Sequence, residues 1–333
     1  MRIAISGLNN TDNPAPGIGV AKSLAKYYDD LVGFSYDPNE PGVYQGIFNK
    51  VYLMPFPRLG YEELEKRLEY IKPDVVIPTL DAELPLYIKY QDELAKKGIK
   101  TYLPTLEQFE MRDKAKLADL SEELGVIYPE TIKMSSIDDL VYASKQFGFP
   151  LMVKGNYYKA YKAYSLEEAI EYFYKISNEW GFPLLAQKVV SGVELNFVGV
   201  ADGEELKGGI AIKKLTTTDI GKVWTAVTID NKEILEVAKN FVKATKWRGP
   251  FELETLSDGK NIYMIEINPR FPAWVYFSTM AGVDLPKMLM DLIEGKEVET
   301  NLNFDIGKMY VRYVDELITD FNNFSKILTT KEL

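Results

Sequence analysis

The chain has 333 residues, of which 46% are hydrophobic and 26% charged, and its formal net charge is −10 at pH 7. It contains no histidine and no cysteine, which excludes Ser-His-Asp chemistry, thiolate nucleophiles, disulfides and metal sites with His or Cys ligands. The negative charge disfavours a general nucleic-acid binder, and no apolar run reaches the roughly 18 residues of a membrane span. We therefore expect a cytoplasmic protein whose chemistry uses carboxylates, lysines, arginines and hydroxyls.

The first hundred residues alternate between short apolar segments and helical patterns. The expected strands are 2–6, 31–35, 50–53, 74–78 and 100–103, and the expected helices are 20–28, 61–71 and 84–97. This alternation predicts a small α/β domain of about five strands over residues 1–104. Gly17 and Gly19 form half of a dinucleotide fingerprint, but position 22 is Lys. A nicotinamide-dependent oxidoreductase is therefore an alternative with an incomplete motif.

From Pro104 onward the pattern changes to longer helices and pairs of strands. The expected helices are 105–124, 136–147, 166–179, 233–245 and 285–294. The expected strands are 149–154, 184–190, 193–200, 207–214, 223–229, 251–256, 262–267 and 307–313. The turn at Asp258-Gly259 predicts that 251–256 and 262–267 form a hairpin.

Acidic side chains alternate with apolar ones on both strands of this hairpin. Because side chains alternate along a strand, Glu266 shares a face with the asparagine and the arginine that follow it at positions 268 and 270. A connecting loop centred on Gly259 would set Glu252 opposite Glu266, and one centred on Lys260 would set Glu254 there, whereas an even two-residue turn would do neither.

Facing glutamates repel each other unless a cation lies between them. Two carboxylates and an asparagine carbonyl suit Mg²⁺, which binds few protein carboxylates and completes its octahedron with phosphate oxygens and water. Arg270 could then bind a phosphate or an acyl phosphate. The alternative is a solvated polar face on an edge hairpin.

Two further segments place polar groups at strand ends. Lys154 ends a strand at the kind of sheet edge where phosphates commonly bind. The segment Gln187 to Val190 precedes a turn and could offer backbone groups to an adenine, and Glu194 could accept hydrogen bonds from a ribose. No Walker A pattern occurs in the sequence, so bound phosphates would need another architecture.

Taken in chain order, these motifs resemble the ATP-grasp superfamily, and within it the carboxylate–amine ligases and the synthetase lobes of the carbamoyl phosphate synthase large subunit. The matching segments are Pro104 with Arg112-Asp113-Lys114, then 148–154, 187–194, 249–254 with 265–270, and 281–286. The resemblance implies mixed α/β and α+β structure, with an ATP-grasp fold behind a Rossmann-like pre-grasp domain. It implies a pre-ATP-grasp domain at 1–104, an N-terminal grasp subdomain with a linker helix at 105–187, a C-terminal grasp subdomain at 188–300, and a strand and tail at 301–333.

The resemblance also implies an activity. Such an enzyme joins a carboxylate to an amine or ammonia through an acyl phosphate and releases ADP and phosphate, with ATP and Mg²⁺ (or Mn²⁺) as cofactors. Its partners would be a small carboxylate and an amine or peptide, without nucleic acid or membrane, and a homodimer stays open. Glu254, Glu266 and Asn268 would hold the metal, and Arg270 and Lys154 would be catalytic. The nucleotide would contact Lys114, Lys154, Lys159, Lys162, Gln187, Lys188, Val189, Val190 and Glu194.

Two segments depart from the family pattern. The run 155–164 stands where a glycine-rich loop usually closes over the phosphates, and it contains four tyrosines together with Lys159 and Lys162. We expect it to be a mobile lid in which these lysines replace backbone amides. The segment 271–274, Phe-Pro-Ala-Trp, places bulk beside the acceptor site. These departures leave open the substrate, an enzyme that stops at an acyl or carbamoyl phosphate, and a non-catalytic nucleotide-binding protein.

Overall fold

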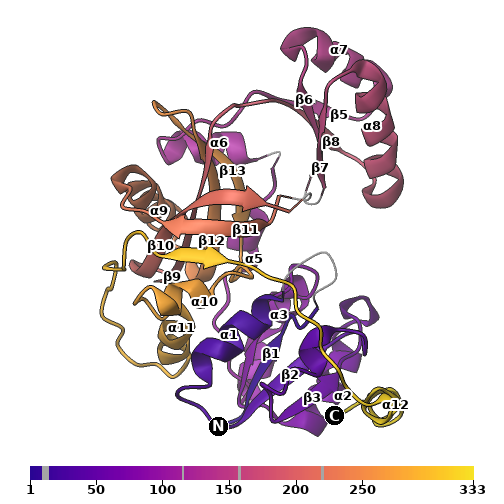
Figure 1. Ribbon diagram of the computed structural model, residues 1–333, viewed down its shortest axis with the longest axis vertical. Helices are drawn as coiled ribbons and strands as arrows, with labels where there is room; N and C mark the ends of the chain where they lie inside the picture. The colour runs from indigo at the N-terminus through magenta and orange to yellow at the C-terminus, as the bar shows by residue number, and fades with distance from the viewer. Residues whose placement is uncertain (10–14, 115, 157–158, 219–220) are drawn as a thin grey trace.

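Figure 1 shows the computed structural model, which describes residues 1–9, 15–114, 116–156, 159–218 and 221–333. Three β-sheets organise these residues, with strand orders β3-β2-β1-β4, β5-β8-β6-β7 and β13-β12-β9-β10-β11-β14. We call the parts built on them the N-terminal lobe, the small lobe and the large lobe. No helix in the described ranges is both long enough and apolar enough to cross a membrane.

The strands differ in length between the lobes. The N-terminal lobe has β1 (Ile3–Ser6), β2 (Leu31–Ser35), β3 (Lys50–Leu53) and β4 (Val75–Ile77). The small lobe has β5 (Thr131–Met134), β6 (Leu151–Gly155), β7 (Ala160–Ala163) and β8 (Leu184–Lys188). The large lobe has β9 (Val193–Asp202), β10 (Leu206–Thr217), β11 (Val223–Thr228), β12 (Arg248–Ser257), β13 (Ile262–Asn268) and β14 (Met309–Val311).

Twelve α-helices are described beside these strands. They are α1 (Pro16–Leu24), α2 (Tyr61–Ile71), α3 (Leu84–Lys89), α4 (Gln91–Lys96), α5 (Leu106–Glu110), α6 (Leu117–Glu123), α7 (Ile137–Phe147), α8 (Leu166–Trp180), α9 (Lys232–Thr245), α10 (Tyr276–Met280), α11 (Leu285–Ile293) and α12 (Phe321–Thr330).

The sheet of the N-terminal lobe is parallel and covered on both faces, as its continuous apolar strands predict. Side chains of α1 pack on one face, and those of α2 and α3 pack on the other. The expected fifth strand is absent among the described residues, because Lys100 forms only an isolated bridge with Val75. Pro104 follows it without an N–H group, so the segment does not continue along the sheet edge.

Three helices differ from expectation. Helix α1 begins at Pro16, four residues earlier than predicted, because proline is well suited to the first helical turn. The helix expected at 84–97 is interrupted at Tyr90, whose ring stacks on that of Tyr61 with centroids 4.0 Å apart. The helix expected at 105–124 divides into α5 and α6, and Ala115 between them lies outside the described residues.

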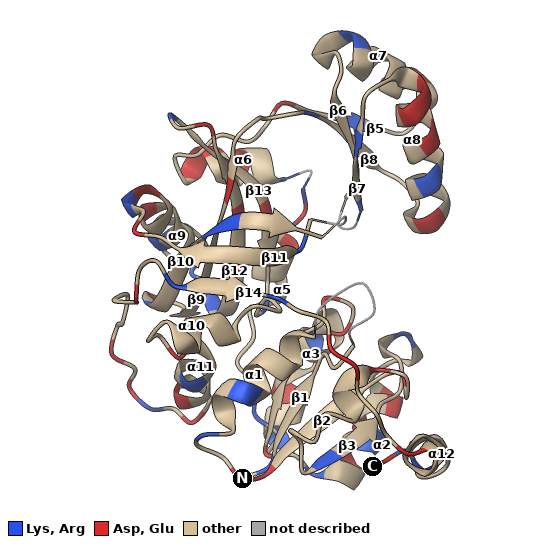
Figure 2. Ribbon diagram, viewed as in Figure 1, with Lys and Arg blue, Asp and Glu red and all other residues tan. Residues whose placement is uncertain are grey.

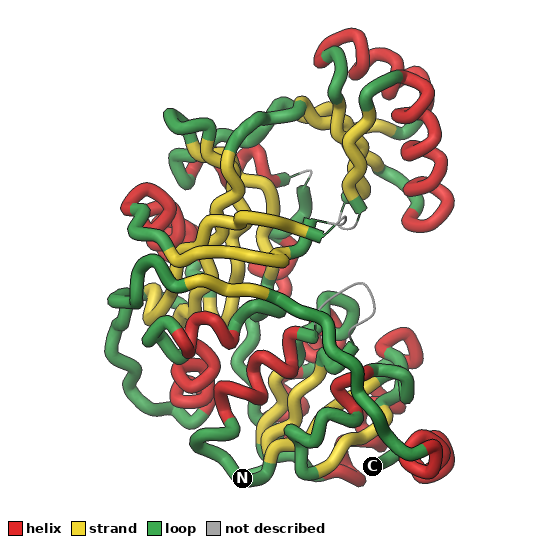
Figure 3. Tube along the Cα trace, viewed as in Figure 1, coloured by secondary structure: helices red, strands yellow, loops and turns green. Residues whose placement is uncertain are grey.

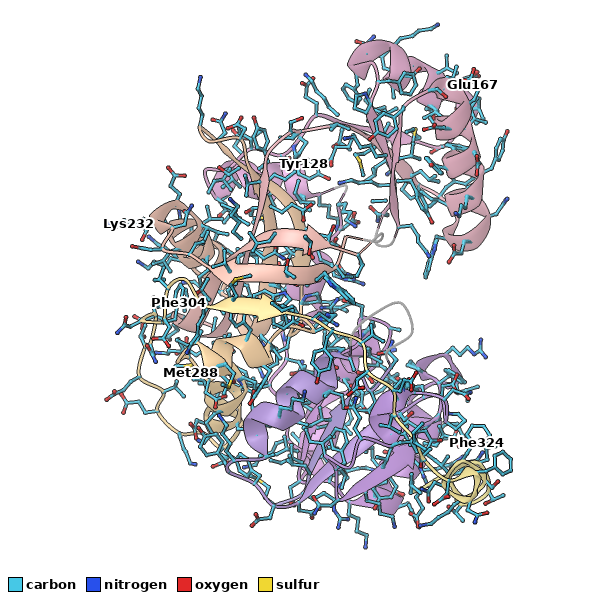
Figure 4. The ribbon with its side chains drawn as sticks, viewed as in Figure 1. Tyr128, Glu167, Lys232, Met288, Phe304 and Phe324 are labelled. Atoms are coloured by element: carbon cyan, nitrogen blue, oxygen red, sulfur yellow. The ribbon has the colours of Figure 1, made fainter. Side chains whose placement is uncertain are left out.

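The small lobe joins the large lobe through two single chain connections. Figure 3 shows that α7 and α8 cover the face of the small sheet that points away from the large lobe. A capping box begins α7, since Ser136 accepts a hydrogen bond from the Asp139 N–H. In Figure 4, Tyr128 lies where the chain leaves the large lobe for the small lobe, and Glu167 lies on α8 at the outer side.

The last described residues connect the large lobe to the N-terminal lobe. After β14 the chain runs along the N-terminal lobe to α12, which carries Phe324 in Figure 4. Ile327 of α12 is fully buried in a cluster with residues of the N-terminal lobe. Leu333 then exchanges two backbone hydrogen bonds with Val51 of β3, at 2.8 and 2.9 Å. The segment 301–333 is therefore packed against both lobes.

The two faces of the large sheet have different neighbours. Phe197, Phe251 and Leu253 point to the face covered by α9. Val198 and Val200 point to the opposite face, where α11 and α1 of the N-terminal lobe complete an apolar core. Because side chains alternate along each strand, the other even-numbered residues of β9 and β12 lie on this second face, between the large and N-terminal lobes.

Candidate functional site

Farther along this second face, polar side chains from four neighbouring strands take the place of the apolar core. Glu252 and Glu254 come from β12, Asn196 from β9, and Lys214 from β10, while Glu266 and Asn268 come from β13. Glu254 pairs with Asn196 on one side and with Glu266 on the other. Adjacent strands therefore bring three oxygen-bearing side chains into a row.

The predicted pairing of Glu254 with Glu266 is confirmed, but the predicted loop is wrong. The strands end at Ser257 and Ile262, so the loop has four residues, an even number. The register shifts by one residue between Glu254 and Thr255, which pairs with Met264, so that Ile265 is the extra residue of a β-bulge. The bulge does what an odd loop would have done, and it sets the two glutamates opposite each other.

Lysines neutralise the two facing glutamates. Lys214 Nζ lies 2.8 Å from Glu254 Oε2 and 2.8 Å from Glu194 Oε2, and Lys114 Nζ lies 3.2 Å from Glu266 Oε1. Burial alone would raise the pKa of Glu254, but the charges of Lys214 and Lys222 hold it below its usual value. The repulsion expected between two facing carboxylates is thus offset by cations of the protein itself.

Glu252 has a different environment from Glu254. It is 3% exposed, and it accepts hydrogen bonds from Asn196 Nδ2 (2.7 Å), Asn268 Nδ2 (3.0 Å) and Trp274 Nε1 (2.9 Å). Burial and the nearby charge of Glu254 raise the pKa of Glu252. These three donors position Glu252 as an anchor for the surrounding side chains.

The N-terminal lobe contributes a carboxylate to the same region. Asp81 Oδ2 accepts hydrogen bonds from Arg270 Nη2 (2.9 Å) and Nε (3.1 Å), and its Oδ1 lies 3.6 Å from Arg112 Nη1. Burial would raise the pKa of Asp81, yet Arg270 and Arg112 lower it. The N–H groups of Thr79 and Leu80 just before Asp81 donate to buried Glu83 at 3.0 Å. The loop that carries Asp81 is therefore fixed at the end of β4.

These residues surround a cavity of about 480 Å³. Its described lining includes seven cationic side chains: Arg112, Lys114, Lys159, Lys214, Lys222, Arg270 and Arg312. Five acidic side chains line it as well: Asp81, Glu179, Glu252, Glu254 and Glu266. The lining is thus net positive in a chain of net charge −10. Figure 2 shows positive and negative residues interspersed over all three lobes, whereas the described cavity lining has more cations than anions.

Lys154 lies at the opposite side of this region, in the small lobe. Its Nζ donates to Gln187 Oε1 at 2.5 Å, and Gln187 Nε2 donates to Thr131 Oγ1 at 2.9 Å. Burial, reinforced by the charge of Lys114, lowers the pKa of Lys154 to about 8. The two predicted nucleotide-binding residues Lys154 and Gln187 are therefore in direct contact on β6 and β8.

The remaining predicted nucleotide-binding residues are dispersed. Lys159 lines the cavity, with Glu179 3.9 Å away. Lys162 is not among the described lining residues of the cavity. It lies in β7, where it pairs with Met152 of β6. Lys188 pairs with Glu130 at 2.5 Å, and Val189 and Val190 follow β8 half-buried. Glu194 is held by Lys214, outside the cavity lining.

The expected lid over 155–164 is only partly a loop. Residues 160–163 form β7, which pairs along its whole length with β6. Tyr157 and Tyr158, which also belong to the expected lid, lie outside the described residues. The bulk expected beside the acceptor site is present, because Pro272, Ala273 and Trp274 line the cavity.

Sequence reasoning missed several lining residues. Asp81 follows the buried strand β4, and an acidic residue after a parallel strand is a usable signal. Asn196 and Lys214 continue the polar side of their strands, which the alternation pattern could have shown. Lys222 and Arg312 have no local signal, because only the pairing of β11 with β14 brings them to the cavity.

The donor set of the hairpin fits a hard divalent cation. Within the described ranges no cluster of three or more His, Cys, Asp or Glu side chains has metal-binding geometry. Mg²⁺ needs only one or two protein carboxylates beside phosphate oxygens and water. Glu254, Glu266 and the Asn268 carbonyl supply such a set, and the buried Asn196 Oδ1 in the same row has no hydrogen-bond partner.

Comparisons with known proteins agree with this geometry. Residues 200–316 match the family described as "ATP-grasp in the biosynthetic pathway with Ter operon". The carbamoyl phosphate synthase large chain of Clostridium acetobutylicum is 23% identical over 288 residues, which cover 81% of this chain and 27% of that protein. The chain thus spans about a quarter of the length of the curated relatives it matches.

Solved structures show the same fold. Biotin carboxylase from Campylobacter jejuni, solved as a β,γ-ATP complex, superposes with a TM-score of 0.70 at 14% identity, over 89% of this chain and 72% of that one. N5-carboxyaminoimidazole synthetase from Staphylococcus aureus superposes with a TM-score of 0.68 at 16% identity, over 90% of this chain and 78% of that one. With its mixed α/β and α+β structure, the chain has an ATP-grasp fold, and residues 200–316 are similar in sequence to an ATP-grasp family.

Proposed function

We propose that the protein is an ATP-dependent ligase that joins a carboxylate to an amine or ammonia through an acyl phosphate. The observation that carries this proposal is the cavity in which Glu254 and Glu266 face each other beside Asn268 and Arg270, within a net positive lining. The similar proteins named above include carbamoyl phosphate synthase and a biotin carboxylase solved as a β,γ-ATP complex, which supports ATP as the phosphoryl donor. Such a reaction depends on positioning and charge neutralisation, so it needs neither histidine nor cysteine.

In this proposal the small lobe binds the nucleotide. Lys154 and Gln187 would contact it, together with the segment from Lys188 to Val190 and with Glu194. Lys114 and Lys159, which line the cavity, would approach the phosphates. Lys162 is not among the described lining residues and would have to reach the phosphates from β7. Glu254, Glu266 and Asn268 would hold Mg²⁺, which neutralises phosphate charge when it is bound.

The large and N-terminal lobes would then bind the carboxylate. A carboxylate oxygen attacks the γ-phosphorus, the bond from that phosphorus to the bridging oxygen breaks, and ADP leaves. Arg270, held in place by Asp81, would stabilise the charge on the transferred phosphoryl group. The amine nitrogen next attacks the acyl carbon, phosphate leaves, and the amine loses a proton.

An isotope experiment tests this sequence of steps. With Mg-ATP and a panel of ¹⁸O-labelled amino acids and dipeptides, we expect ADP release that requires both a carboxylate and an amine, and transfer of one ¹⁸O atom to phosphate. ADP release without an amine, with the intermediate trapped by hydroxylamine, would instead indicate an enzyme that stops at the acyl phosphate.

A binding experiment addresses the site without knowledge of the substrate. A non-hydrolysable ATP analogue should stabilise the protein only when Mg²⁺ is present, and Glu266→Gln should remove that stabilisation. Glu204→Gln is the matched control, because Glu204 is an exposed glutamate on a turn of the same lobe. If the wild-type protein does not bind the analogue, the proposed function is wrong.

A further inference from the structure

Lys222 and Arg312 are cations of the cavity that the proposed reaction does not use. Lys222 directly precedes β11 and Arg312 directly follows β14. The Arg312 N–H donates to the Trp224 carbonyl at 2.9 Å, so Arg312 lies opposite a residue two positions from Lys222. Opposite and diagonal residues on antiparallel strands share a face at about 5 to 8 Å, and both side chains line the cavity.

The carboxylates of the described cavity lining already have partners. Glu254 pairs with Lys214 and Glu266 with Lys114. Asp81 binds two arginines, Glu179 lies beside Lys159, and Glu252 accepts from two amides and an indole. Within the described ranges neither Lys222 nor Arg312 lies within ion-pair distance of a carboxylate.

Arg312 is held in place although it lacks an anion. Its Nη2 donates to the hydroxyl of Tyr310 at 2.6 Å, and its guanidinium lies 5.6 Å from the centre of that ring. Its Nε is buried without a hydrogen-bond partner. A fixed guanidinium with an unused donor, beside a second cation, is an arrangement that an anionic ligand would stabilise.

Lys222 and Arg312 line the same cavity as Arg270 and Asp81, whereas Lys154 and Gln187 are not among its described lining residues. In Figure 1, β14 is the strand on the side of the large lobe that faces the N-terminal lobe, whereas β6 and β8, which carry Lys154 and Gln187, lie beyond the opposite side. Arg270 and Asp81, where the substrate carboxylate is proposed to react, line the same cavity, and so do the apolar residues Pro272 and Trp274. An anionic group bound at Lys222 and Arg312 would therefore be part of the molecule that carries the substrate carboxylate.

We propose that Lys222 and Arg312 bind a second anionic group of the substrate, so that the carboxylate activated beside Arg270 belongs to a molecule with a further carboxylate or phosphate. This inference rests on the proposed function and defines its substrate class. One anionic end would lie at Arg270, and the other at the paired ends of β11 and β14.

Calorimetric titrations test the inference with defined probes. The protein is saturated with Mg²⁺ and a non-hydrolysable ATP analogue, and the dicarboxylates from malonate to adipate are compared with their monomethyl esters and with phosphonocarboxylates of equal length. We expect at least one dicarboxylate or phosphonocarboxylate to bind ten times more tightly than the monoester, which corresponds to about 1.4 kcal/mol. Which of the two classes binds better identifies the second group as a carboxylate or a phosphate.

Variants assign the preference to the two cations. Arg312→Gln and Lys222→Gln should each remove most of the tenfold preference, and Arg312→Lys should retain part of it. Lys326→Gln, which removes an exposed charge from α12, should leave it unchanged. The affinity of the Arg312 variants and of Lys326→Gln for the ATP analogue should stay within about twofold of the wild-type value, which also shows that these variants are folded. Circular dichroism checks the fold of Lys222→Gln, because the charge of Lys222 also acts on Glu254.

The outcomes distinguish this inference from the proposed function. If the analogue binds and no diacid or phosphonate in the series is preferred over its monoester, the inference is wrong while the proposed function stands. If Arg312→Gln weakens the analogue and the monoester as much as the diacid, Arg312 is a general phosphate contact and the inference is again wrong. Failure of the wild-type protein to bind the analogue contradicts the proposed function itself.

Discussion

Lys154 offers a quantitative test, because its environment changes when phosphates arrive. Burial and the charge of Lys114 lower its pKa from 10.5 to about 8, and Glu266 and Glu254 only partly oppose this effect. At about 1.36 kcal/mol per unit, the protonated side chain costs the folded protein on the order of 3 kcal/mol. The folded-state pKa is below the unfolded value, so this cost is complete below pH 8 and disappears as the pH rises to 10.5.

Nucleotide binding should therefore be coupled to proton uptake. Phosphate oxygens beside Lys154 would restore a high pKa, so at pH 8 the binding of a non-hydrolysable ATP analogue should take up about half a proton per site. Calorimetry in two buffers with different ionisation enthalpies measures this number directly. Between pH 8 and about 10.5, the affinity for the analogue should fall by up to about tenfold per pH unit.

The variant Lys154→Met separates this effect from other titrating groups. It should lose the proton uptake at pH 8, and it should bind the analogue more weakly. Without nucleotide it should be more stable than the wild-type protein by about 2 kcal/mol at pH 7, after allowance for the lost hydrogen bond to Gln187, and this gain should be absent at pH 10.5. Lys133→Met, at an exposed position of the same sheet, is the control. Equal proton uptake in the wild-type protein and Lys154→Met would refute the reasoning.

Four other predictions follow from the ion pairs of the cavity. Glu266→Gln should abolish ADP release in a coupled assay while circular dichroism shows an intact fold, and unchanged turnover would contradict the metal assignment. Glu254→Gln should abolish turnover and also lower the melting temperature, because buried Lys214 would lose one of its two carboxylates at a cost of roughly 1 to 3 kcal/mol; if Glu252→Gln alone is inactive, the choice of Glu254 as ligand is wrong. Asp81→Asn should lower kcat tenfold or more with little change in the analogue Kd, since it frees Arg270 and touches no proposed nucleotide residue; a change in Kd alone would count against this role. Trypsin should cut after Lys159 faster than after Lys162, which lies within β7, and Mg²⁺ with the analogue should suppress the cut at Lys159, whereas equal cleavage with and without bound nucleotide would show that this turn is not the lid.

Much of the fold follows from local patterns in the sequence. The apolar strand at 75–77, the capping box at Ser136 and the alternation in 251–256 each depend on near neighbours in the chain, and each is present. The interruptions of the helices at Tyr90 and after Glu110 were not predictable in this way. They depend on contacts with distant residues, such as the stacking of Tyr90 on Tyr61.

The candidate site divides in the same manner. Glu254, Glu266 and Asn268 could be found because one hairpin brings them together, although the bulge that fixes their register has no obvious local signal. Arg312 lies far from the hairpin in sequence, and it enters the cavity only because β14 joins the edge of the large sheet. Pairing between distant segments is not encoded in hydrophobic periodicity, so such residues require the structure.

The C-terminal segment determines which parts of the molecule can move against each other. It joins the outer strand of the large sheet to the edge of β3, so it links the large and N-terminal lobes in addition to the apolar core that α1 and α11 share. Among the described residues, the chain connects the small lobe to the large lobe beside Tyr128 and after Lys188. We therefore expect the hinge motion to belong to the small lobe alone. The carboxylate pocket would be assembled before ATP binds. Closure of the small lobe would then bring the nucleotide to that preformed pocket.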